Sequence, residues 1–444
     1  MLRILANLIQ NKRIVLLGFG LEGQSSFRFF TKYFPKNRIL VADRNPQIAN
    51  HPLLQNKLVE MSSGEAYLGS ILEDDFIVKS PGIKLPSDCR IETGSIYSQT
   101  DLFIQNFRKQ IIGITGTKGK STTSSLLFKI LQDQGKEVVL LGNIGKPAFD
   151  YWDKITDHTF VVFELSAHQL EYTKFSPAYA ILLNLFPEHL DYFRTENHYF
   201  DAKFNIAKFQ LAKDRFYFGD LEHTNFLSSN LKSKLKPSVY ELINDTIVKQ
   251  HSATPLLQLN ELLYLKGLHQ LKNCLPLLSL SRDLNLDEEQ VLNSIKTFVP
   301  LPHRIEFAGK IKQTSFYNDS ISTIPEASIE ALKALQNVRY LILGGLDRTL
   351  DYQKLYSFLL SFPLKKVFFI GPAGKRMFAE MNLTYSFEKI LLDSLHDFEA
   401  QLPYLIQDRE PEICLLSPAA ASYDEFRNFE ARGDYFKSLI HKLL

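Results

Sequence analysis

Cysteine, tryptophan and long apolar runs are scarce in this chain of 444 residues. The three cysteines, Cys89, Cys274 and Cys414, lie far apart and outside any histidine pattern typical of a metal site. We therefore expect inert thiols and a reducing compartment, not a disulfide framework. No apolar run is long enough to span a bilayer, and residues 1–10 lack the apolar core and cleavage site of a signal peptide. These absences predict a soluble, cytoplasmic protein without a membrane span.

An excess of charge of either sign is also missing. The 51 lysines and arginines nearly balance the 49 acidic residues, which leaves a net charge of +2. This balance gives no reason to expect nucleic acid or an acidic membrane surface as a partner. A hydrophobic content of 45% is typical of globular proteins. The length suits about three domains of ordinary size.

The most informative stretch is the glycine-rich segment Gly113-Ile-Thr-Gly-Thr-Lys-Gly-Lys-Ser-Thr-Thr123. It follows an apolar run and leads into an amphipathic helical pattern at 124–131. Glycines let the backbone approach phosphates, and a helix N-terminus directs free N–H groups at them. Lys120 can reach the β- and γ-phosphates of a nucleotide, and Ser121 can ligate Mg²⁺. Although Ile114 stands where the general phosphate-loop pattern has glycine, the segment predicts nucleotide binding over a plain capped turn.

Polar residues follow each of three apolar runs, at 138–141, 159–163 and 179–183. Such runs favour strands of a parallel sheet, and ligands collect at the carboxyl ends of parallel strands. Glu164 is a hard oxygen ligand suited to Mg²⁺. His189 is either a ligand or a core histidine, and Glu188 or Asp191 could serve in its place. For Lys203 the helical pattern alone favours a surface lysine.

The N-terminal stretch carries a second glycine motif, Gly18-Phe-Gly-Leu-Glu-Gly23, after a predicted strand at 13–17. A helical pattern, a strand at 38–42 and Asp43 follow, which completes the dinucleotide-binding fingerprint. It predicts a phosphate group on a helix N-terminus, with Asp43 or Arg44 near a ribose or base. No hydride site is visible. A strand at 76–79 runs into Ser80-Pro-Gly82, which is either a ligand-facing loop or a plain turn.

The remaining sequence predicts a peripheral antiparallel region at 214–265, a helix from Gly267, and a domain boundary near residues 298–302. Strands are predicted at 314–317, 340–343, 366–370 and 413–416, with helices at 326–335 and 423–444. In this part Arg304 could clamp a phosphate and Asp319 could hold a ribose hydroxyl or a metal-bound water. An Arg–carboxylate pair that fixes the domain is the equal alternative. The pattern as a whole predicts an α/β protein of three domains, at 1–108, 109–299 and 300–444.

Taken together, these motifs resemble the Mur ligase family, in the family's order and over the whole chain. The motifs are Gly113 to Thr122, Gly142-Asn-Ile-Gly145, Glu164-Leu-Ser166, Glu188-His-Leu-Asp191, Lys203, His269 to Asn273, Leu301-Pro-His-Arg304, Asn318-Asp-Ser320 and Leu416-Ser-Pro-Ala419. The N-terminal glycine loop and the C-terminal segment 416–433 are most similar to the branch that adds glutamate to UDP-N-acetylmuramoyl-L-alanine. The resemblance implies Rossmann-like first and third domains around a central domain with a P-loop ATPase-like parallel sheet.

The resemblance also implies an activity, which is a cytoplasmic step of peptidoglycan synthesis and hence of cell wall biogenesis. ATP would phosphorylate the terminal alanine carboxylate of the UDP-sugar, and the amine of glutamate would attack the acyl phosphate. The implied cofactors are ATP and Mg²⁺. We expect a monomer whose third domain closes on the nucleotide.

Site residues carried over by the resemblance fall into five groups. The catalytic residues would be Lys120, His189 and Lys203. The metal ligands would be Ser121, Glu164, His189 and a carbamylated Lys203. For Lys203 the resemblance thus replaces the interpretation as a surface lysine. Those of ATP are Gly116, Thr117, Lys118, Gly119, Lys120, Ser121, Thr122, Asn273, Arg304 and Asp319. Those of the UDP-sugar are Gly18, Gly20, Leu21, Glu22, Gly23, Asp43, Arg44, Ser80, Pro81, Gly82, Asn143 and Ser166. Those of glutamate are Thr323, Arg348, Ser422, Tyr423 and Phe429.

Two departures from the family pattern lie in the amino-acid pocket. Ile321 stands where many D-glutamate ligases have lysine, and Arg348 matches a glutamate-binding lysine, although arginine prefers a planar, bidentate partner. The sequence therefore leaves an L-glutamate ligase open beside the D-glutamate enzyme. It also leaves open a folylpolyglutamate-synthase-like ligase and a non-catalytic protein that binds a nucleotide or NAD.

Overall fold

The computed structural model describes residues 2–55, 59–85, 95–144, 146–219, 221–251, 254–265, 268–300, 302–335, 337–381, 385–406 and 410–443. Four residues named above, Cys89, Gly145, Gly267 and Leu301, lie outside these ranges, as does the side chain of Asp191. The chain divides into two compact units, Met1–Val299 and Pro300–Leu444, and each is described by itself.

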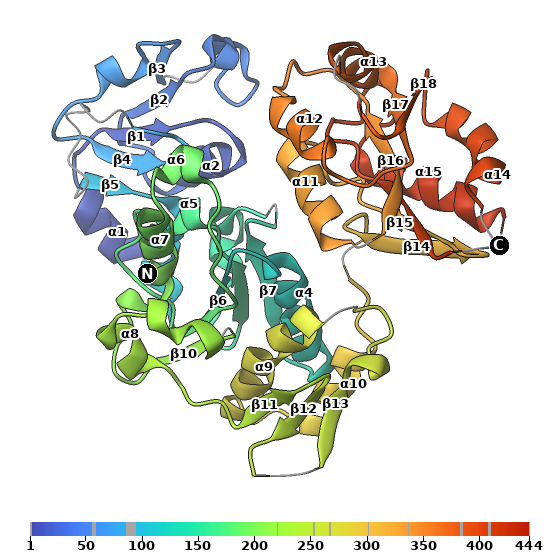
Figure 1. Ribbon diagram of the computed structural model, residues 1–444. Helices are drawn as coiled ribbons and strands as arrows, with labels where there is room; N and C mark the ends of the chain where they lie inside the picture. Colours follow the sequence, from blue (N-terminus) through green and yellow to red (C-terminus); the bar gives the residue numbers. More distant parts are fainter. Residues whose placement is uncertain are drawn as a thin grey trace. The chain divides into compact units, whose positions relative to one another are not determined.

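The first unit begins with a five-stranded sheet in the order β3-β2-β1-β4-β5, in which every neighbouring pair is parallel (blue in Figure 1). The central strand β1 consists of Ile-Val-Leu-Leu and is buried along its whole length, as expected for a parallel strand covered on both faces. The elements of this region are α1 (Leu2–Ile9), β1 (Ile14–Leu17), α2 (Leu21–Tyr33), β2 (Ile39–Asp43), β3 (Glu60–Ser63), β4 (Phe76–Lys79), β5 (Ile96–Tyr97) and α3 (Gln99–Phe107). The sequence did not predict α1, which buries Leu5 and Ile9.

A second parallel sheet follows in the same unit, in the order β10-β9-β6-β8-β7. Its strands are β6 (Ile111–Thr115), β7 (Val138–Gly142), β8 (Phe160–Glu164), β9 (Tyr179–Leu182) and β10 (Arg215–Phe218). Its helices are α4 (Lys120–Asp133), α5 (Ala167–Leu170), α6 (Leu190–Phe193), α7 (Glu196–Lys208), α8 (Ser229–Lys234), α9 (Leu268–Asp283) and α10 (Glu288–Lys296). The antiparallel or peripheral extension predicted at 214–265 is confirmed from residue 240 on, as a small antiparallel sheet of β11 (Tyr240–Ile243), β12 (Thr246–Lys249) and β13 (Pro255–Gln258). It is wrong at 215–218, because β10 is a parallel strand of the central sheet.

One continuous apolar core joins the two parallel sheets of this unit. The ring of Phe29 on α2 stacks on Phe149, with ring centroids 4.1 Å apart. Beside this stack, Arg28 of α2 forms a two-pronged contact with the carboxylate of Asp150, at 2.9 and 2.8 Å. The core crosses residue 108, where the sequence predicts a domain boundary, so both sheets hold fixed positions within one unit.

The second unit is a six-stranded sheet in the order β14-β15-β19-β16-β17-β18. Only the edge pair β14–β15 is antiparallel, and the other pairs are parallel. The strands are β14 (Glu306–Ile311), β15 (Thr314–Asn318), β16 (Val338–Gly344), β17 (Lys366–Ile370), β18 (Glu388–Leu392) and β19 (Glu412–Leu416). The helices are α11 (Pro325–Ala334), α12 (Gln353–Leu359), α13 (Gly371–Glu380), α14 (Leu402–Leu405) and α15 (Phe429–His441). This confirms the predicted α/β architecture.

One predicted boundary in this unit is wrong. The last helix begins at Phe429, not at residue 423, because the side chain of Asn428 accepts a hydrogen bond from the backbone N–H of Ala431 and caps the helix. The segment before it is therefore a loop, which leaves Ser422 and Tyr423 outside the helix.

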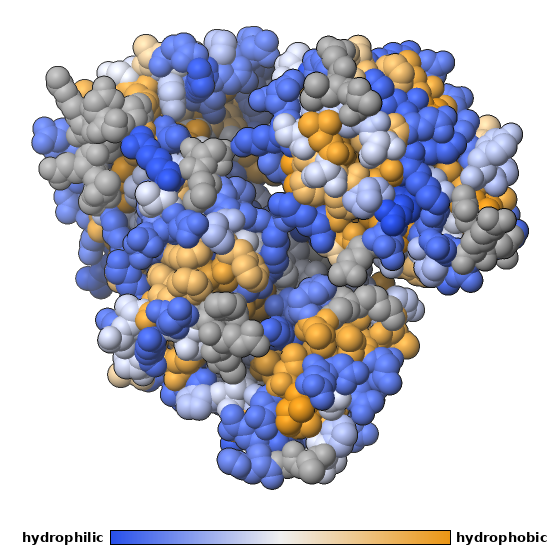
Figure 2. Space-filling model, in the orientation of Figure 1, coloured by the Kyte–Doolittle hydropathy of each residue, from blue (hydrophilic) through white to orange (hydrophobic). Residues whose placement is uncertain are grey.

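In the part of the chain that the structure describes, no helix is both long and apolar enough to cross a membrane. On the face drawn in Figure 2, hydrophilic residues cover most of the surface, and the hydrophobic ones gather in separate areas.

Gly20, the N-cap of α2, and Gly23, in the first turn of this helix, form a matched pair for a test of the geometry of the glycine motif. A Cβ on Gly23 would lie 2.1 Å from the carbonyl oxygen of Gly18, whereas nothing lies within 4 Å of a Cβ on Gly20. We expect Gly23→Ala to lower the free energy of unfolding by about 3 kcal/mol and Gly20→Ala by less than about 1 kcal/mol. Urea unfolding of both variants checks this, and equal losses would contradict it.

Candidate functional site

The phosphate loop joins β6 to α4 at the carboxyl edge of the central sheet. Gly119 has a φ of 83°, a left-handed value that favours glycine. A Cβ at this position would lie 2.5 Å from the side-chain nitrogen of Asn273 on α9. The structure therefore places Asn273 directly against the loop, together with the other nucleotide residues predicted in the first unit.

The segment that follows β9 holds the loop in shape. The side chain of Asn184 accepts a hydrogen bond from the N–H of Lys118 at 2.8 Å and donates one to its carbonyl at 3.1 Å. The hydroxyl of Thr117 bonds the backbone of Phe186 in the same two-way manner, at 3.1 and 3.0 Å. Sequence reasoning missed this support, although its signal, a polar residue directly after an apolar strand, was present at Asn184.

Two lysine side chains meet on one carbonyl oxygen of the loop. The Nζ of Lys120 donates to the carbonyl of Gly116 at 3.0 Å, and the Nζ of Lys203 on α7 donates to the same oxygen at 2.8 Å. Lys203 is almost fully buried, with 1% of its surface exposed, so the surface reading from the helical pattern is wrong. Burial, and secondly the charge of Lys120, lower the pKa of Lys203 well below its usual value.

Glu164 stands at the end of β8 with one carboxylate oxygen satisfied and one not. Its Oε1 accepts from the side-chain amide of Asn143 at 2.9 Å, whereas Oε2 is buried without a hydrogen-bond partner in the described chain. No group of three or more histidine, cysteine or acidic residues within the described ranges could hold a metal ion. Within the described chain, the unpartnered oxygen of Glu164 is a hard ligand of the kind that Mg²⁺ takes.

The predicted metal residues around Glu164 lie on neighbouring elements. Ser121 is buried in the first turn of α4. The exposed His189 has a φ of 55°, and its ring centroid lies 6.0 Å from that of Tyr199. The Nζ of Lys203 lies 4.7 Å from the centre of the same tyrosine ring. Glu188, the alternative to His189, instead forms an ion pair with Lys118.

The first glycine loop and the Ser80-Pro-Gly82 segment contact each other, as the ligand-facing reading of that segment requires. The hydroxyl of Ser80 donates to the carbonyl of Gly18 at 3.1 Å. Asp43 at the end of β2 accepts from the N–H of Phe19 at 2.7 Å. The exposed Arg44 pairs with Glu65 at 2.9 Å.

A cavity of about 160 Å³ lies between this loop and the central sheet. It is lined by Leu21, Glu22, Pro81, Gly142, Asn143, Pro147 and Gln169. Four of these were predicted as sugar-nucleotide residues, and they come from three separate stretches of the chain. Ser166, which was also predicted to bind the sugar nucleotide, does not line the cavity. It caps α5 through a reciprocal pair of hydrogen bonds with Gln169.

Glu22 is the most perturbed acidic group beside this cavity. Its Oε1 accepts from the side-chain amide of Gln169 at 2.6 Å, and its Oε2 is buried without a hydrogen-bond partner in the described chain. Burial raises the pKa of Glu22 to about 7, against the opposing effects of the Gln169 bond and the Lys79 charge. Sequence reasoning missed Gln169 and Lys79, because neither belongs to a recognisable motif.

Lys79, at the end of β4, is itself 3% exposed. Burial lowers its pKa to about 8, partly offset by Glu171 and Glu22. The hydroxyl of Tyr192 donates to Glu171 at 2.8 Å and lies 3.4 Å from the Lys79 ammonium. This buried cluster connects the Ser-Pro-Gly segment to α5 and α6 within the first unit.

In the second unit, Asp319 is buried and Arg304 is exposed. Asp319 accepts from the hydroxyl of Ser417 at 2.7 Å and the N–H of Ile305 at 3.2 Å. Burial raises the pKa of Asp319 to about 6 despite these bonds and the charge of Arg304.

Four of the predicted amino-acid residues lie on three loops of this unit, and the fifth, Phe429, begins α15. Arg348 donates to the carbonyl of Thr323 at 3.0 Å, which brings two of the five together. Phe429 accepts a bond on its carbonyl from the hydroxyl of Ser320 at 2.8 Å. Ser422 is buried, and Tyr423 is 68% exposed.

Comparison with known proteins gives matches over nearly the whole chain. Residues 114–252 match the family model of the Mur ligase middle domain. The UDP-N-acetylmuramoylalanine–D-glutamate ligase of a Thermoanaerobacter species is 30% identical over 465 residues, which cover 98% of this chain and 99% of the relative. The enzyme of the same name from Koribacter versatilis is 29% identical over 455 residues and 98% of both chains.

Among solved structures, UDP-N-acetylmuramate-alanine ligase MurC of Thermotoga maritima aligns with a TM-score of 0.53 at 16% identity. The alignment covers 97% of this chain and 99% of that one. At this identity the likeness shows the three-domain α/β fold alone.

The raised pKa of Glu22 predicts a pH-dependent stability. The folded protein keeps a proton that the unfolded chain releases, so Glu22 lowers stability as the pH rises from 4.5 to about 7. Glu22→Gln removes this titration while keeping the shape. We expect the variant to gain up to about 3 kcal/mol of unfolding free energy relative to wild type between pH 4.5 and pH 8.

Urea unfolding at a series of pH values measures this difference. The exposed Glu73→Gln variant is the control, with an expected change below about 0.5 kcal/mol at every pH. A difference between Glu22→Gln and wild type that stays constant across the range would rule out the titration.

Proposed function

The chain belongs to the Mur ligase family, and we propose that it joins D-glutamate to UDP-N-acetylmuramoyl-L-alanine at the expense of ATP, in the synthesis of peptidoglycan in the cytoplasm. The observation that carries this proposal is the position of Asn143. Its amide bonds Glu164 beside the phosphate loop, and the same residue lines the cavity at the first glycine loop. A sugar nucleotide and a nucleoside triphosphate can therefore meet on one rigid unit.

The reaction follows from the chemistry of the acceptor. A carboxylate is a poor electrophile, so its oxygen takes the γ-phosphoryl group of ATP and ADP leaves. The amine of glutamate then attacks the carbonyl carbon of the acyl phosphate, and inorganic phosphate leaves with the amide formed. Both steps bring anions together, and Lys120 supplies a positive charge at the loop for the transferred phosphoryl group.

Mg²⁺ fits the residues at the same edge. Ser121, Glu164 and His189 would hold it, and the unpartnered Oε2 of Glu164 is the observation that supports this. A bound Mg²⁺ neutralises phosphate charge during transfer. Lys203 would take part as a carbamate, since its buried amine lies at the loop between Lys120 and the ring of Tyr199.

The domains divide this work in our proposal. Residues 1–108 bind the UDP-sugar through the first glycine loop and Ser80-Pro-Gly82, residues 109–299 bind ATP and Mg²⁺, and residues 300–444 bind glutamate. Asn273, Arg304 and Asp319 complete the nucleotide residues.

Three competing functions are less favoured. The relatives that cover 98% of this chain carry the D-glutamate name, which argues against both the L-glutamate ligase and a folylpolyglutamate-synthase-like enzyme. The paired Lys120 and Lys203 argue against a protein that only binds a nucleotide.

An assay of ADP and phosphate release with UDP-N-acetylmuramoyl-L-alanine and each glutamate enantiomer tests the function. We expect turnover with D-glutamate, and a fall in kcat of about 10²- to 10³-fold in Lys120→Ala, because a charge at the transferred phosphoryl group is lost. Turnover with L-glutamate alone would establish the other enantiomer. No turnover with either would refute the ligase.

The role of Lys203 gives a separate prediction. A lysine carbamate forms reversibly from CO₂, so enzyme kept in CO₂-free buffer should lose activity and regain it on addition of bicarbonate. We expect Lys203→Ala to lose about 100-fold or more in kcat and to gain nothing from bicarbonate. Steady-state rates with and without bicarbonate measure this, and wild-type activity that ignores CO₂ would exclude the carbamate.

A further inference from the structure

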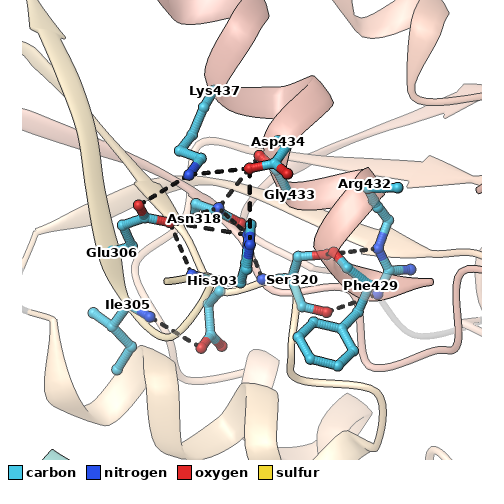
Figure 3. A network of polar contacts seen from close by, with 12 residues as sticks. His303, Ile305, Glu306, Asn318, Ser320, Phe429, Arg432, Gly433, Asp434 and Lys437 are labelled. Carbon is cyan, nitrogen blue, oxygen red and sulfur yellow. Dashed lines mark hydrogen bonds and ion pairs between the residues drawn. The ribbon is translucent and has the colours of Figure 1, made fainter. Parts of the chain in front are cut away.

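Arg432, in the first turns of α15, is a buried guanidinium with 1% of its surface exposed. It donates hydrogen bonds to one side-chain hydroxyl and to three backbone carbonyls. Nε bonds the hydroxyl of Ser320 at 2.9 Å, Nη2 bonds the carbonyls of Ser320 and Ala420 at 2.9 and 3.0 Å, and Nη1 bonds the carbonyl of Ala421 at 3.2 Å. Figure 3 shows the guanidinium turned toward Ser320 and Phe429.

Each of these partners lies within three positions of a predicted amino-acid residue. Ser320 precedes Thr323 by three positions, and its hydroxyl also donates to the carbonyl of Phe429. Ala420 and Ala421 immediately precede Ser422 and Tyr423. One side chain therefore joins the loop that follows β15, the loop that follows β19, and the first turn of α15.

The loop that follows β16 and carries Arg348 also contacts the guanidinium of Arg432. A Cβ on Gly345 would lie 3.0 Å from Nη1 of Arg432 and 2.2 Å from the carbonyl oxygen of Ala421. Gly345 has a φ of 135°, and Arg348 follows it three positions later. The loop that carries Arg348 is thus packed directly on Arg432, without room for a side chain between them.

The helix that carries Arg432 is itself held firmly. A Cβ on Gly433 would lie 2.1 Å from Nδ1 of His303, and the side-chain amide of Asn318 donates to the carbonyl of Gly433 at 3.3 Å. Lys437 forms ion pairs with Glu306 and Asp434 at 3.1 and 3.2 Å (Figure 3). These contacts fix the start of α15 against β14 and β15, so the position of the guanidinium is set by the sheet.

The charge of Arg432 is retained although its hydrogen-bond partners are neutral. Burial lowers the pKa of its guanidinium to about 10, which keeps it protonated at neutral pH, and the carboxylates of Asp424 and Glu425 oppose the shift from a distance. A buried cation bonded to neutral oxygens is costly and keeps a positive field that favours an anion close by.

We propose that Arg432 is the positioning residue of the amino-acid pocket, which holds the Ser320, Gly345 and Ala420 loops in the register that binds the carboxylates of the incoming glutamate. This inference rests on the function proposed above. A lysine cannot replace the guanidinium, because a single ammonium cannot bond the loops after β15 and β19 at the separate angles that Nε, Nη1 and Nη2 serve.

Kinetics of Arg432→Lys and Arg432→Met test the proposal on the full-length enzyme. We expect the KM for glutamate to rise at least about tenfold in both, with the KM values for ATP and the UDP-sugar within twofold of wild type. Arg427→Met, at an exposed arginine just before α15, is the matched control and should keep all three constants. A purely structural role would lower the active fraction, and thus kcat, without separating the three KM values.

Ser320→Ala provides a second route if the arginine variants fail to fold. It removes the hydroxyl between Arg432 and Phe429 and leaves the guanidinium in place, so the KM for glutamate should rise about two- to fivefold. Folded variants with an unchanged KM for glutamate, or with all three KM values changed equally, would overturn the proposal. Wild-type enzyme without any ligase activity would instead refute the proposed function.

Discussion

Two lysine amines on the carbonyl oxygen of Gly116 form the contact on which the central site depends. Two like charges repel strongly at low dielectric, so the arrangement is costly without an anion and favourable with one. Burial of Lys203 weakens that repulsion by disfavouring its charged form. The bonds of Asn184 and Thr117 keep the shape of the loop that holds these two amines.

The remainder of the first unit places a cavity at the first glycine loop, against the end of β7. Several strands of both sheets end in polar residues, among them Asp43, Lys79 and Glu164. The core between α2 and the 148–154 segment keeps the two carboxyl edges in place. Asn143 connects the phosphate-loop region with this cavity, because its side chain bonds Glu164 and also lines the cavity beside Glu22. The relative positions of the two glycine-rich loops are therefore set by packing within this unit.

Much of the fold and part of the candidate site could be predicted from the sequence. Whether a residue's position could be predicted depends on how local the interactions are that determine it. The strands and the two glycine loops follow from short-range patterns, because backbone conformation and burial leave a local signature. The burial of Lys203 does not, since only tertiary packing decides which lysine of α7 enters the core. The start of α15 was misplaced because the cap at Asn428 competes with a run of helix-compatible residues. Arg432 belongs to the C-terminal motif, yet its partners lie about a hundred residues away or on another loop, and no spacing reveals them.

Because one core spans residue 108, the segment before this residue cannot simply be exchanged for that of a related enzyme. An exchange of residues 1–108 with those of a relative would cut through the stack of Phe29 on Phe149 and the contact of Arg28 with Asp150. The segment taken from the relative would have to supply an aromatic and a charged group that match Phe149 and Asp150. Residues 1–299 would therefore have to be exchanged as one segment and residues 300–444 as another, so this chain has fewer exchangeable parts than it has sheets.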